Sequence, residues 1–311
     1  MIPMKIRELA SGLLFPEGPV YMEDGSIVLV EIARGTLTSI TPDGRVSVVC
    51  DLGGGPNGAA IGPDGSIFIC NNGGFEFTTE SDGCFRPFSQ AKDYTTGRIE
   101  RVNLNTGKFE RVADQVDGAS LKGPNDIVFD RFGGFYFTDL GKVRPLDMDR
   151  GAIYYCNAQG KFSKVAGPLM SPNGIALSPD GNTLYYAETE GARLWAFDIT
   201  SPGVLKKLGW PSPQGARMVC AAPGGIYQRF DSIAVDAFGN VCVATLHHGG
   251  ITNVAPDAKV LTHIPIPDQY TTNICFGGKD MRTAFITLSG TGKLIAVDDW
   301  PVPGLKLSYS A

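Results

Sequence analysis

The sequence predicts an all-β protein built as a six-bladed β-propeller. Forty glycines and 21 prolines stand against 19% charged residues, a composition typical of many short strands separated by turns. Six segments align without a gap, and each opens with a polar residue: Glu17, Asn57, Asn125, Asn173, Asp231 and Asn273. In the first five segments a glycine stands eight positions further on, at Gly25, Gly65, Gly133, Gly181 and Gly239. The sixth has Met281 there and lacks the turn signal.

Each segment predicts a β-hairpin whose first strand starts at the polar residue. The residues that follow are apolar without strict alternation, as in 127–129 and 233–235, which indicates a strand buried on both faces. A tight turn and a second apolar strand come next. Further strand-like runs give about four strands in about 40 to 50 residues, the period of a propeller blade. The last segment lacks a fourth strand, so the N-terminal strand expected at 5–9 is predicted to complete it and close the ring.

Residues 1–311 are expected to form a single domain, because one large all-β domain of this length is common. The net charge of −5, without a basic stripe, argues against a nucleic-acid partner. The sequence has no run of 18 apolar residues, so we expect no membrane span. Several of the seven cysteines sit in apolar strand-like runs, which predicts buried free thiols. Together with charges where a signal peptide would be apolar, this predicts a cytoplasmic location.

Propeller geometry predicts which loops share a face with the six opening residues. If these residues begin the innermost strands at one mouth of the ring, the glycine turns lie at the opposite mouth. Long loops at 73–96 and 140–150, and the connection 207–230, then reach the mouth of the opening residues. Binding and catalytic loops usually gather on one face of a rigid scaffold. Chemistry is therefore predicted at this mouth.

The ring of opening residues has two carboxylates and four amides, which suit a cation such as Ca²⁺, Mg²⁺ or Mn²⁺. Buried carboxylates also need a partner, and a divalent cation supplies one. The alternative is that Asn and Asp begin these strands because they form turns and bond the local backbone. Glu17 is not a turn former, and six polar residues in one register favour the metal site.

Other signals are weaker than the ring. Gly53, Gly55 and Gly58 match a dinucleotide-binding pattern, but a strand follows where that site needs a helix. His247 and His248 are expected at the mouth, either lining it or acting as acid or base.

A second set of acids, Glu31, Asp139 and Glu188, ends the returning strands and is expected to make hydrogen bonds rather than bind metal. Asp126, next to Asn125, is expected to point away from it and to bond the neighbouring blade.

Four motifs in this order resemble the SMP-30/gluconolactonase/regucalcin-like family: EGP at 17–19, PND at 124–126, SPNG at 171–174 and DSIAVD at 231–236. The stretch NDIVFDRFGGFYFTD is especially similar to the bacterial drug-responsive lactonase branch. The resemblance implies a six-bladed propeller with one divalent cation in its central tunnel. It also implies an enzyme that hydrolyses lactones or other esters.

Position by position, the resemblance implies that Glu17, Asn173 and Asp231 are the core metal ligands. Asn125 would be a fourth ligand or a substrate contact, and Ser232 would assist beside Asp231.

The other opening residues, Asn57 and Asn273, are expected either on the substrate side or in a structural role, and His247 is expected to bind substrate at the mouth. Sugar-lactone members often have an arginine where this chain has Gly123, which brings gluconolactone-type substrates into question.

The predicted function is a metal-dependent lactonase acting on a small lactone or ester. The cation would polarise the carbonyl and activate water, with Ca²⁺ as the first choice and Mg, Mn, Zn or Fe as alternatives. Asp231 would take a proton from the attacking water, and Asn125 would orient the carbonyl. The alternatives are an esterase or phosphotriesterase, a condensing or ring-closing enzyme like the strictosidine synthase group, and a non-catalytic calcium-binding propeller.

Overall fold

Each of the six aligned segments folds into an antiparallel hairpin, as predicted. The turn glycines have left-handed backbones, with φ of +82° at Gly25 and +86° at Gly239, which glycine adopts without steric cost. Met281 takes the same place in the sixth hairpin with φ of +58°, and its N–H donates to the carbonyl of Gly278 at 3.1 Å. The sixth turn therefore forms without its glycine, because the two strands that it joins are paired along their length.

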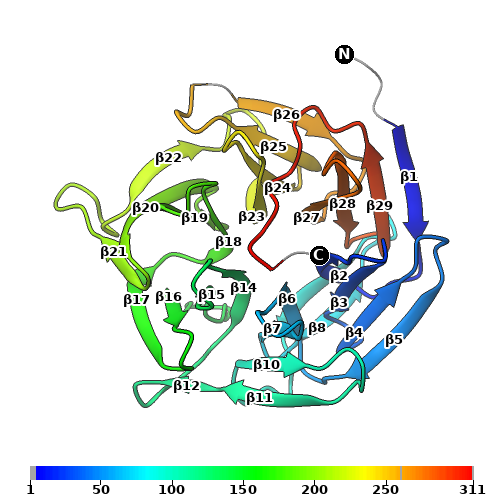
Figure 1. The fold of residues 1–311 in the computed structure, drawn as a ribbon, viewed down its shortest axis with the longest axis horizontal. Coiled ribbons are helices and arrows are strands. Elements are labelled where there is room, and N and C mark those ends of the chain that lie inside the picture. The colour runs from blue at the N-terminus through cyan, green and yellow to red at the C-terminus, as the bar shows by residue number, and fades with distance from the viewer. Residues whose placement is uncertain (1–4, 260, 310–311) are drawn as a thin grey trace.

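The structure is a computed structural model that describes residues 5–259 and 261–309. Residues 1–4, 260, 310 and 311 of the predicted domain lie outside the described residues. The blades surround a central axis, and the first strand of each aligned segment is innermost (Figure 1). The described part of the chain contains no helix long and apolar enough to span a membrane.

The strands of each blade follow one another from the axis outward. The first blade contains β2 (Pro16–Tyr21), β3 (Ile27–Glu31), β4 (Thr36–Ile40) and β5 (Val46–Asp51). The second contains β6 (Pro56–Ile61), β7 (Ile67–Asn71), β10 (Arg98–Val102) and β11 (Phe109–Ala113). The third contains β14 (Pro124–Phe129), β15 (Phe135–Asp139), β16 (Gly151–Cys156) and β17 (Phe162–Leu169).

The remaining blades keep the same order with one addition. The fourth contains β18 (Pro172–Leu177), β19 (Thr183–Glu188), β20 (Arg193–Ser201) and β21 (Val204–Lys206), and β22 (Arg217–Ala221) also pairs with β20. The fifth contains β23 (Arg229–Val235), β24 (Val241–Leu246), β25 (Gly250–Val254) and β26 (Leu261–Pro265). The sixth contains β27 (Thr271–Gly277), β28 (Thr283–Leu288), β29 (Lys293–Asp298) and β1 (Lys5–Ala10).

The predicted closure of the ring by the N-terminal strand is confirmed. β1 pairs antiparallel with β29, and Lys5 lies opposite Asp298. The Arg7 guanidinium adds an ion pair to the Asp298 carboxylate at 2.7 Å. Six apolar clusters, each formed by two neighbouring blades, make up the described core. The blades therefore hold the inner strands in fixed positions around the axis.

The long loop expected at 73–96 contains structure of its own. β8 (Phe75–Thr79) and β9 (Phe85–Gln90) form a separate two-stranded sheet, which we call the β8–β9 hairpin. A second small sheet, β12 (Gln115–Val116) and β13 (Ala119–Ser120), lies between the second and third blades in sequence.

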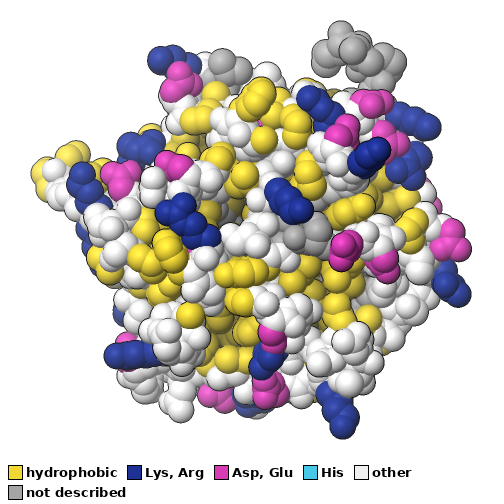
Figure 2. Space-filling model, viewed as in Figure 1, with side chains coloured by type: hydrophobic (Ala, Val, Ile, Leu, Met, Phe, Trp, Pro, Cys, Tyr) yellow, Lys and Arg dark blue, Asp and Glu magenta, His cyan; other side chains and the backbone are white. Residues whose placement is uncertain are grey.

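The segment after β29 (299–309), which we call the C-terminal segment, closes the tunnel at the end where the glycine turns lie. The N–H of Leu305 donates to the carbonyl of Val235 at 3.0 Å, and Trp300 is buried in the cluster between the fifth and sixth blades. Figure 1 shows this segment crossing the centre of the ring. On the same face, Figure 2 shows apolar side chains bordering the centre, with acidic and basic side chains scattered around them.

Candidate functional site

The pairing of every innermost strand is irregular beside its opening residue. In β2 the register shifts between Glu17 and Val20, and in β27 it shifts between Thr271 and Asn273. The other four inner strands have the same irregularity at the same level. Such bulges bend a strand and re-aim its side chains. The repeated bulge therefore explains how six polar residues can leave the pleat of their sheets at one level of the axis.

Glycines that follow three of the opening residues let the inner strands approach each other closely. A Cβ on Gly18 would lie 2.7 Å from the carbonyl oxygen of Asn57, and one on Gly58 would lie 2.5 Å from that of Asn125. A Cβ on Gly174 would likewise lie 2.7 Å from the carbonyl oxygen of Asp231. These glycines serve close packing of backbones at the axis, not a hairpin turn.

The structure brings Glu17, Asn173, Asp231 and Asn273 together as a buried polar cluster. Asn273 Nδ2 donates to Oε2 of Glu17 at 2.8 Å, and the N–H of Gly18 donates to the same oxygen at 2.9 Å. Burial raises the pKa of Glu17 to about 7 against these hydrogen bonds, which lower it. Burial and the charge of Glu17 raise the pKa of Asp231 well above its usual value, while a hydrogen bond from Asn173 opposes the shift.

Asn173 carries the clearest sign of a missing partner in this cluster. Its Oδ1 atom is buried and has no hydrogen-bond partner among the described residues, although nearly all buried polar atoms in proteins are paired. An amide oxygen beside two buried carboxylates is a donor set that a hard divalent cation would satisfy. The described residues contain no group of three His, Cys, Asp or Glu side chains placed for a metal, so a site here would combine its carboxylates with other oxygen donors such as the Asn173 amide.

Asn57 and Asn125 begin β6 and β14 at the same level as the cluster. Asn57 is buried and Asn125 is half-buried, so Asn125 is the more accessible of the two. The expected local backbone bonding is found at Asn273, whose Oδ1 accepts the N–H of Ile274 at 2.8 Å. A bond to the local backbone does not exclude a place in the buried cluster, because Asn273 has both.

Asp126 adds a third carboxylate near the axis, which sequence reasoning did not assign to the site. As expected, it contacts the neighbouring blade, because Oδ2 accepts the N–H of Ile175 at 3.4 Å. Burial, together with the charge of Glu17, raises its pKa to about 7, while hydrogen bonds from Ile127, Ile175 and Ser232 lower it. In the sequence, Asp126 is marked only by its place in the PND motif at 124–126. The bulge in β14 explains its orientation.

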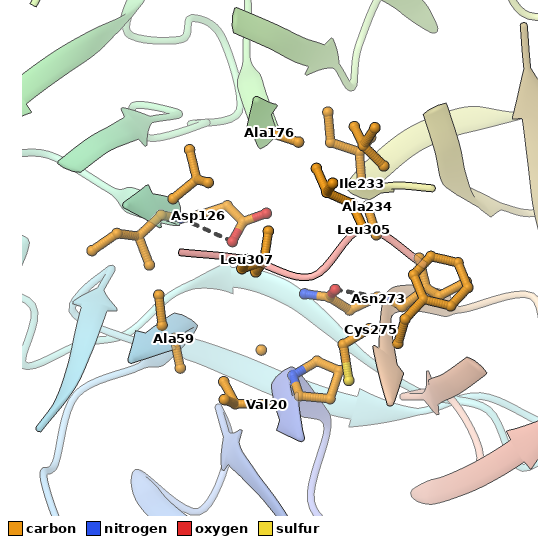
Figure 3. Close-up of a pocket in the computed structure, with 18 of the residues that line it drawn as sticks. Val20, Ala59, Asp126, Ala176, Ile233, Ala234, Asn273, Cys275, Leu305 and Leu307 are labelled. Carbon is orange, nitrogen blue, oxygen red and sulfur yellow. Dashed lines mark hydrogen bonds between the residues drawn. The ribbon is translucent and has the colours of Figure 1, made fainter. Parts of the chain in front are cut away.

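An apolar cavity of about 130 Å³ lies inside the ring, lined by the inner strands and by the C-terminal segment (Figure 3). Asp126 and Asn273 are the polar side chains labelled at its wall, and Leu305 and Leu307 of the C-terminal segment line it as well. The apolar walls explain why the carboxylate of Asp126 is so strongly desolvated.

His247 and His248 lie at the mouth beside the β8–β9 hairpin. They line a hollow of about 380 Å³ that also contacts Asp82 and Cys84 at the tip of the hairpin. His247 has φ of +67°, a conformation uncommon for residues other than glycine, and its ring lies 5.7 Å from that of Tyr270. Burial lowers the pKa of His247, so this side chain is largely neutral at pH 7.

His248 stacks on another histidine. Its ring lies 3.9 Å from that of His263, and the two rings are almost parallel.

The second set of acids makes hydrogen bonds, as expected. Glu31 accepts the N–H of Leu14 at 2.7 Å, and Glu188 accepts the Trp195 indole at 2.9 Å. Asp139 accepts the N–H groups of Lys122 and Gly123 at 2.7 Å each.

Gly123 has a steric reason to lack a side chain. A Cβ there would lie 2.6 Å from the carbonyl oxygen of Gly141, so the loop after β15 occupies the space of any larger residue.

Comparisons with known proteins agree with this architecture. Residues 15–290 match the model of the SMP-30/Gluconolactonase/LRE-like region. A gluconolactonase of Zymomonas mobilis is 27% identical over 91% of this chain and 79% of its own length. A 6-deoxy-6-sulfogluconolactonase of Pseudomonas putida is 29% identical over 63% of this chain, and a lactonase drp35 of Staphylococcus saprophyticus is 28% identical over 76% of this chain. These last two matches span 64% of each relative's length.

Two solved structures share the fold. Regucalcin of Agrobacterium tumefaciens, described as calcium-binding, superposes with a TM-score of 0.76 at 20% identity and covers 97% of this chain and 96% of its own. A gluconolactonase of Xanthomonas campestris gives a TM-score of 0.74 at 23% identity and covers 96% of this chain and 90% of its own. The family match spans most of the chain and includes the cluster of Glu17, Asn173 and Asp231. The chain therefore belongs to the SMP-30/gluconolactonase/LRE-like family.

Proposed function

We propose that this protein is a metal-dependent lactonase. Family membership and the lactonase activities named for its relatives support the reaction class. The observation that carries the metal requirement is the buried cluster, in which two carboxylates of raised pKa lie with an unpaired amide oxygen. Two such carboxylates without a cation are costly to ionise, and a divalent ion offsets that cost.

Glu17, Asn173 and Asp231 would hold the cation, with Asn125 as a further oxygen donor from the more accessible side. A divalent cation supplies Lewis-acid polarisation of an ester carbonyl when it is bound here. The oxygen-only donor set favours Ca²⁺, Mg²⁺ or Mn²⁺ over ions that prefer nitrogen or sulfur.

Asp231 and Asn125 are proposed to act in the hydrolysis in addition to holding the cation. Asp231 accepts a proton from water as the water oxygen bonds to the carbonyl carbon, since its carboxylate would be ionised when the cation is bound and can then act as a base. The ring C–O bond then breaks, and the ring oxygen leaves as a hydroxyl group with a proton returned from Asp231. Asn125 donates its amide N–H toward the carbonyl, and the product is an open-chain hydroxy acid.

Asn57 and His247 are proposed to contact the substrate from the second and fifth blades. For Asn273 the contacts favour the structural alternative over the substrate side, because Nδ2 donates to Glu17 and Oδ1 accepts the N–H of Ile274. We therefore assign Asn273 to positioning Glu17. The cytoplasmic location predicted from the sequence stays a prediction.

Metal analysis and a substrate panel test the proposal together. The purified protein is assayed on lactones, aryl esters and open-chain hydroxy acids, with release of acid followed by pH-stat titration. The expected result is lactone opening that stops after chelation and returns with added Ca²⁺, Mg²⁺ or Mn²⁺. Lactone hydrolysis at an undiminished rate after complete chelation would overturn the metal requirement, and a preference for aryl esters would overturn the substrate class.

A further inference from the structure

Five buried side-chain polar atoms have no hydrogen-bond partner among the described residues, and all of them lie at the mouth of the polar cluster. They are Asn72 Nδ2, Lys142 Nζ, Asn173 Oδ1, Thr189 Oγ1 and Gln228 Oε1. Each belongs to the start of an inner strand or to the residues next to a strand end at that face. Buried polar atoms are normally paired, so such a concentration indicates a surface arranged for a polar ligand. The proposed cation accounts for the unpaired oxygen of Asn173, but not for the other four atoms.

Lys142 is the exceptional member of this set because it carries a charge. It lies three residues after β15 and is only 3% exposed, the one buried lysine among the described residues. Its Nζ atom lies 4.8 Å from the centre of the Phe75 ring and 4.5 Å from that of Tyr94. Both rings belong to the segment that carries the β8–β9 hairpin. The ammonium group thus lies under the hairpin at the mouth, between two aromatic faces.

The carboxylates near Lys142 are engaged by other donors. Asp139 accepts the backbone N–H groups of Lys122, Gly123 and Gly141. Asp149 accepts the guanidinium of Arg144 at 3.0 Å. The three N–H bonds of the ammonium therefore have no acceptor among the described residues.

Cation–π contacts compensate only part of the cost of burying this charge. Such contacts are individually much weaker than the hydration that an ammonium group loses when it is buried. Burial lowers the pKa of Lys142 to about 8, while Asp139 and Asp149 raise it. The side chain is therefore mostly cationic at pH 7, and its ammonium group has nearby carboxylates but no hydrogen-bond acceptor among the described residues.

A second unused donor lies at the base of the same hairpin. Asn72 follows β7, and its Oδ1 accepts the N–H of Gly74 at 2.8 Å, which leaves Nδ2 without an acceptor. The hairpin is a sheet of its own, not hydrogen-bonded into the second blade. It is tied to the loop after β28, because the N–H of Phe85 donates to the carbonyl of Gly290 at 2.9 Å. A ligand would therefore reach Nζ by movement of the flexible lysine stem.

We propose that Lys142, together with Asn72, forms an anion subsite at the mouth, so that the preferred lactones carry a carboxylate, sulfonate or phosphate group away from the ring. The inference rests on the proposed lactonase function. The cation would hold the reacting carbonyl, and Lys142 would hold the anionic substituent under the β8–β9 hairpin. A charged substituent would thus be recognised by a charge-assisted hydrogen bond.

A matched pair of substrates tests this assignment: the γ-butyrolactone that bears a 3-carboxylate, and its neutral 3-carboxamide. Lys142→Met keeps an apolar stem of similar length, Lys142→Arg keeps the charge, and Lys122→Met removes an exposed lysine from the adjoining loop as a control. We expect Lys142→Met to lower the ratio of kcat/KM for the carboxylate to kcat/KM for the amide about tenfold or more, as loss of a charge-assisted hydrogen bond predicts. Lys142→Arg should retain part of the ratio, and Lys122→Met all of it.

The pH profile supplies a readout that a merely structural role would not produce. KM for the carboxylate should rise above about pH 8 as the ammonium loses its proton, while KM for the amide stays level. An unchanged substrate ratio in a folded Lys142→Met protein would overturn the anion subsite, as would an equal loss on both substrates.

Binding separates failure of the subsite from failure of the lactonase function. If the wild-type protein opens neither lactone, the lactonase function fails. The subsite is then judged by whether the carboxylate raises the Tm of the wild-type protein more than that of Lys142→Met.

Discussion

The side chain of Asn273 in the last blade holds the carboxylate of Glu17 in the first blade through a 2.8 Å hydrogen bond. The two residues meet where the first and last blades of the ring are neighbours. The same Glu17 oxygen accepts the N–H of Gly18, which fixes the carboxylate in the buried cluster. Closure of the propeller and geometry of the proposed metal site are thus linked by one side chain.

Loss of this hydrogen bond should weaken metal binding without unfolding the ring. Asn273→Ala is expected to lower the affinity for Ca²⁺ about 10- to 100-fold, since partners that orient metal ligands commonly have effects of this size. Isothermal titration calorimetry measures the affinity. Asn253→Ala, a change on β25 away from the axis, serves as the control and should leave it within about twofold. Equal affinities for Asn273→Ala and wild type would show that Glu17 needs no orienting partner.

Removal of the Glu17 charge should abolish activity but not stability. Glu17→Gln is expected to reduce lactone hydrolysis by about 10² or more, because an electrostatic contribution to the transition state is lost. Chelator-treated Glu17→Gln should melt at or above the wild-type Tm, since a buried charge of raised pKa has been removed. Asp24→Asn, in the exposed turn of the same blade, is the matched control. A Tm several degrees below wild type in the chelator would contradict this account of Glu17.

Asp231→Asn is expected to impair metal binding and proton transfer together, because Asp231 is assigned to both. The variant should stay folded, lose the Tm increase that Ca²⁺ produces in wild type, and lose hydrolysis. Differential scanning fluorimetry with and without Ca²⁺ measures the increase. A variant that still opens lactones at the wild-type rate would remove Asp231 from the proposed mechanism.

The chelator-treated protein should lose stability as the pH rises from 5 to 7.5. Burial raises the pKa of Glu17 to about 7, above its value of about 4.5 in the unfolded chain, so the folded protein binds this proton more tightly. Stability linked to Glu17 is therefore present at low pH and is lost as the pH rises through about 7. Urea denaturation at each pH gives the free energy of unfolding, and Glu17→Gln should reduce the slope. Ca²⁺ should oppose the loss, because it binds the deprotonated carboxylates. A wild-type protein that gains stability over this range in the chelator, relative to Glu17→Gln, would refute the sign.

The repeat predicted the ring because its signals are local and recur at one spacing. Glycine turns, apolar strands and one polar residue per unit are visible without any knowledge of contacts, and Met281 shows that strand pairing can supply a turn where the signal is lost. The unequal roles within the ring could not be predicted from the residues alone. They depend on contacts between blades, such as the one between Asn273 and Glu17.

Two side chains show why parts of the site remained hidden in the sequence. Asp126 lies near the axis because a bulge interrupts β14, and a bulge has no signature in a single sequence. Lys142 is one lysine in a polar loop, where the ordinary expectation is solvent exposure. Only the packing of the β8–β9 hairpin over that loop makes it a buried cation.

The close approach of inner strands gives a last prediction on stability. Gly18 has φ of +51°, and a Cβ would lie 2.7 Å from the carbonyl oxygen of Asn57 and 2.8 Å from the N–H nitrogen of Ala59. Gly18→Ala must therefore push two blades apart at the axis as well as strain its own backbone, and we expect a loss of about 3 kcal/mol or more. Gly181→Ala is the matched control: φ is +72° there, but nothing lies within 4 Å of the added Cβ. Its loss should be only about 1 to 2 kcal/mol, from the backbone alone. Urea denaturation of both variants measures the difference, and equal losses would mean that the inner strands have room to separate.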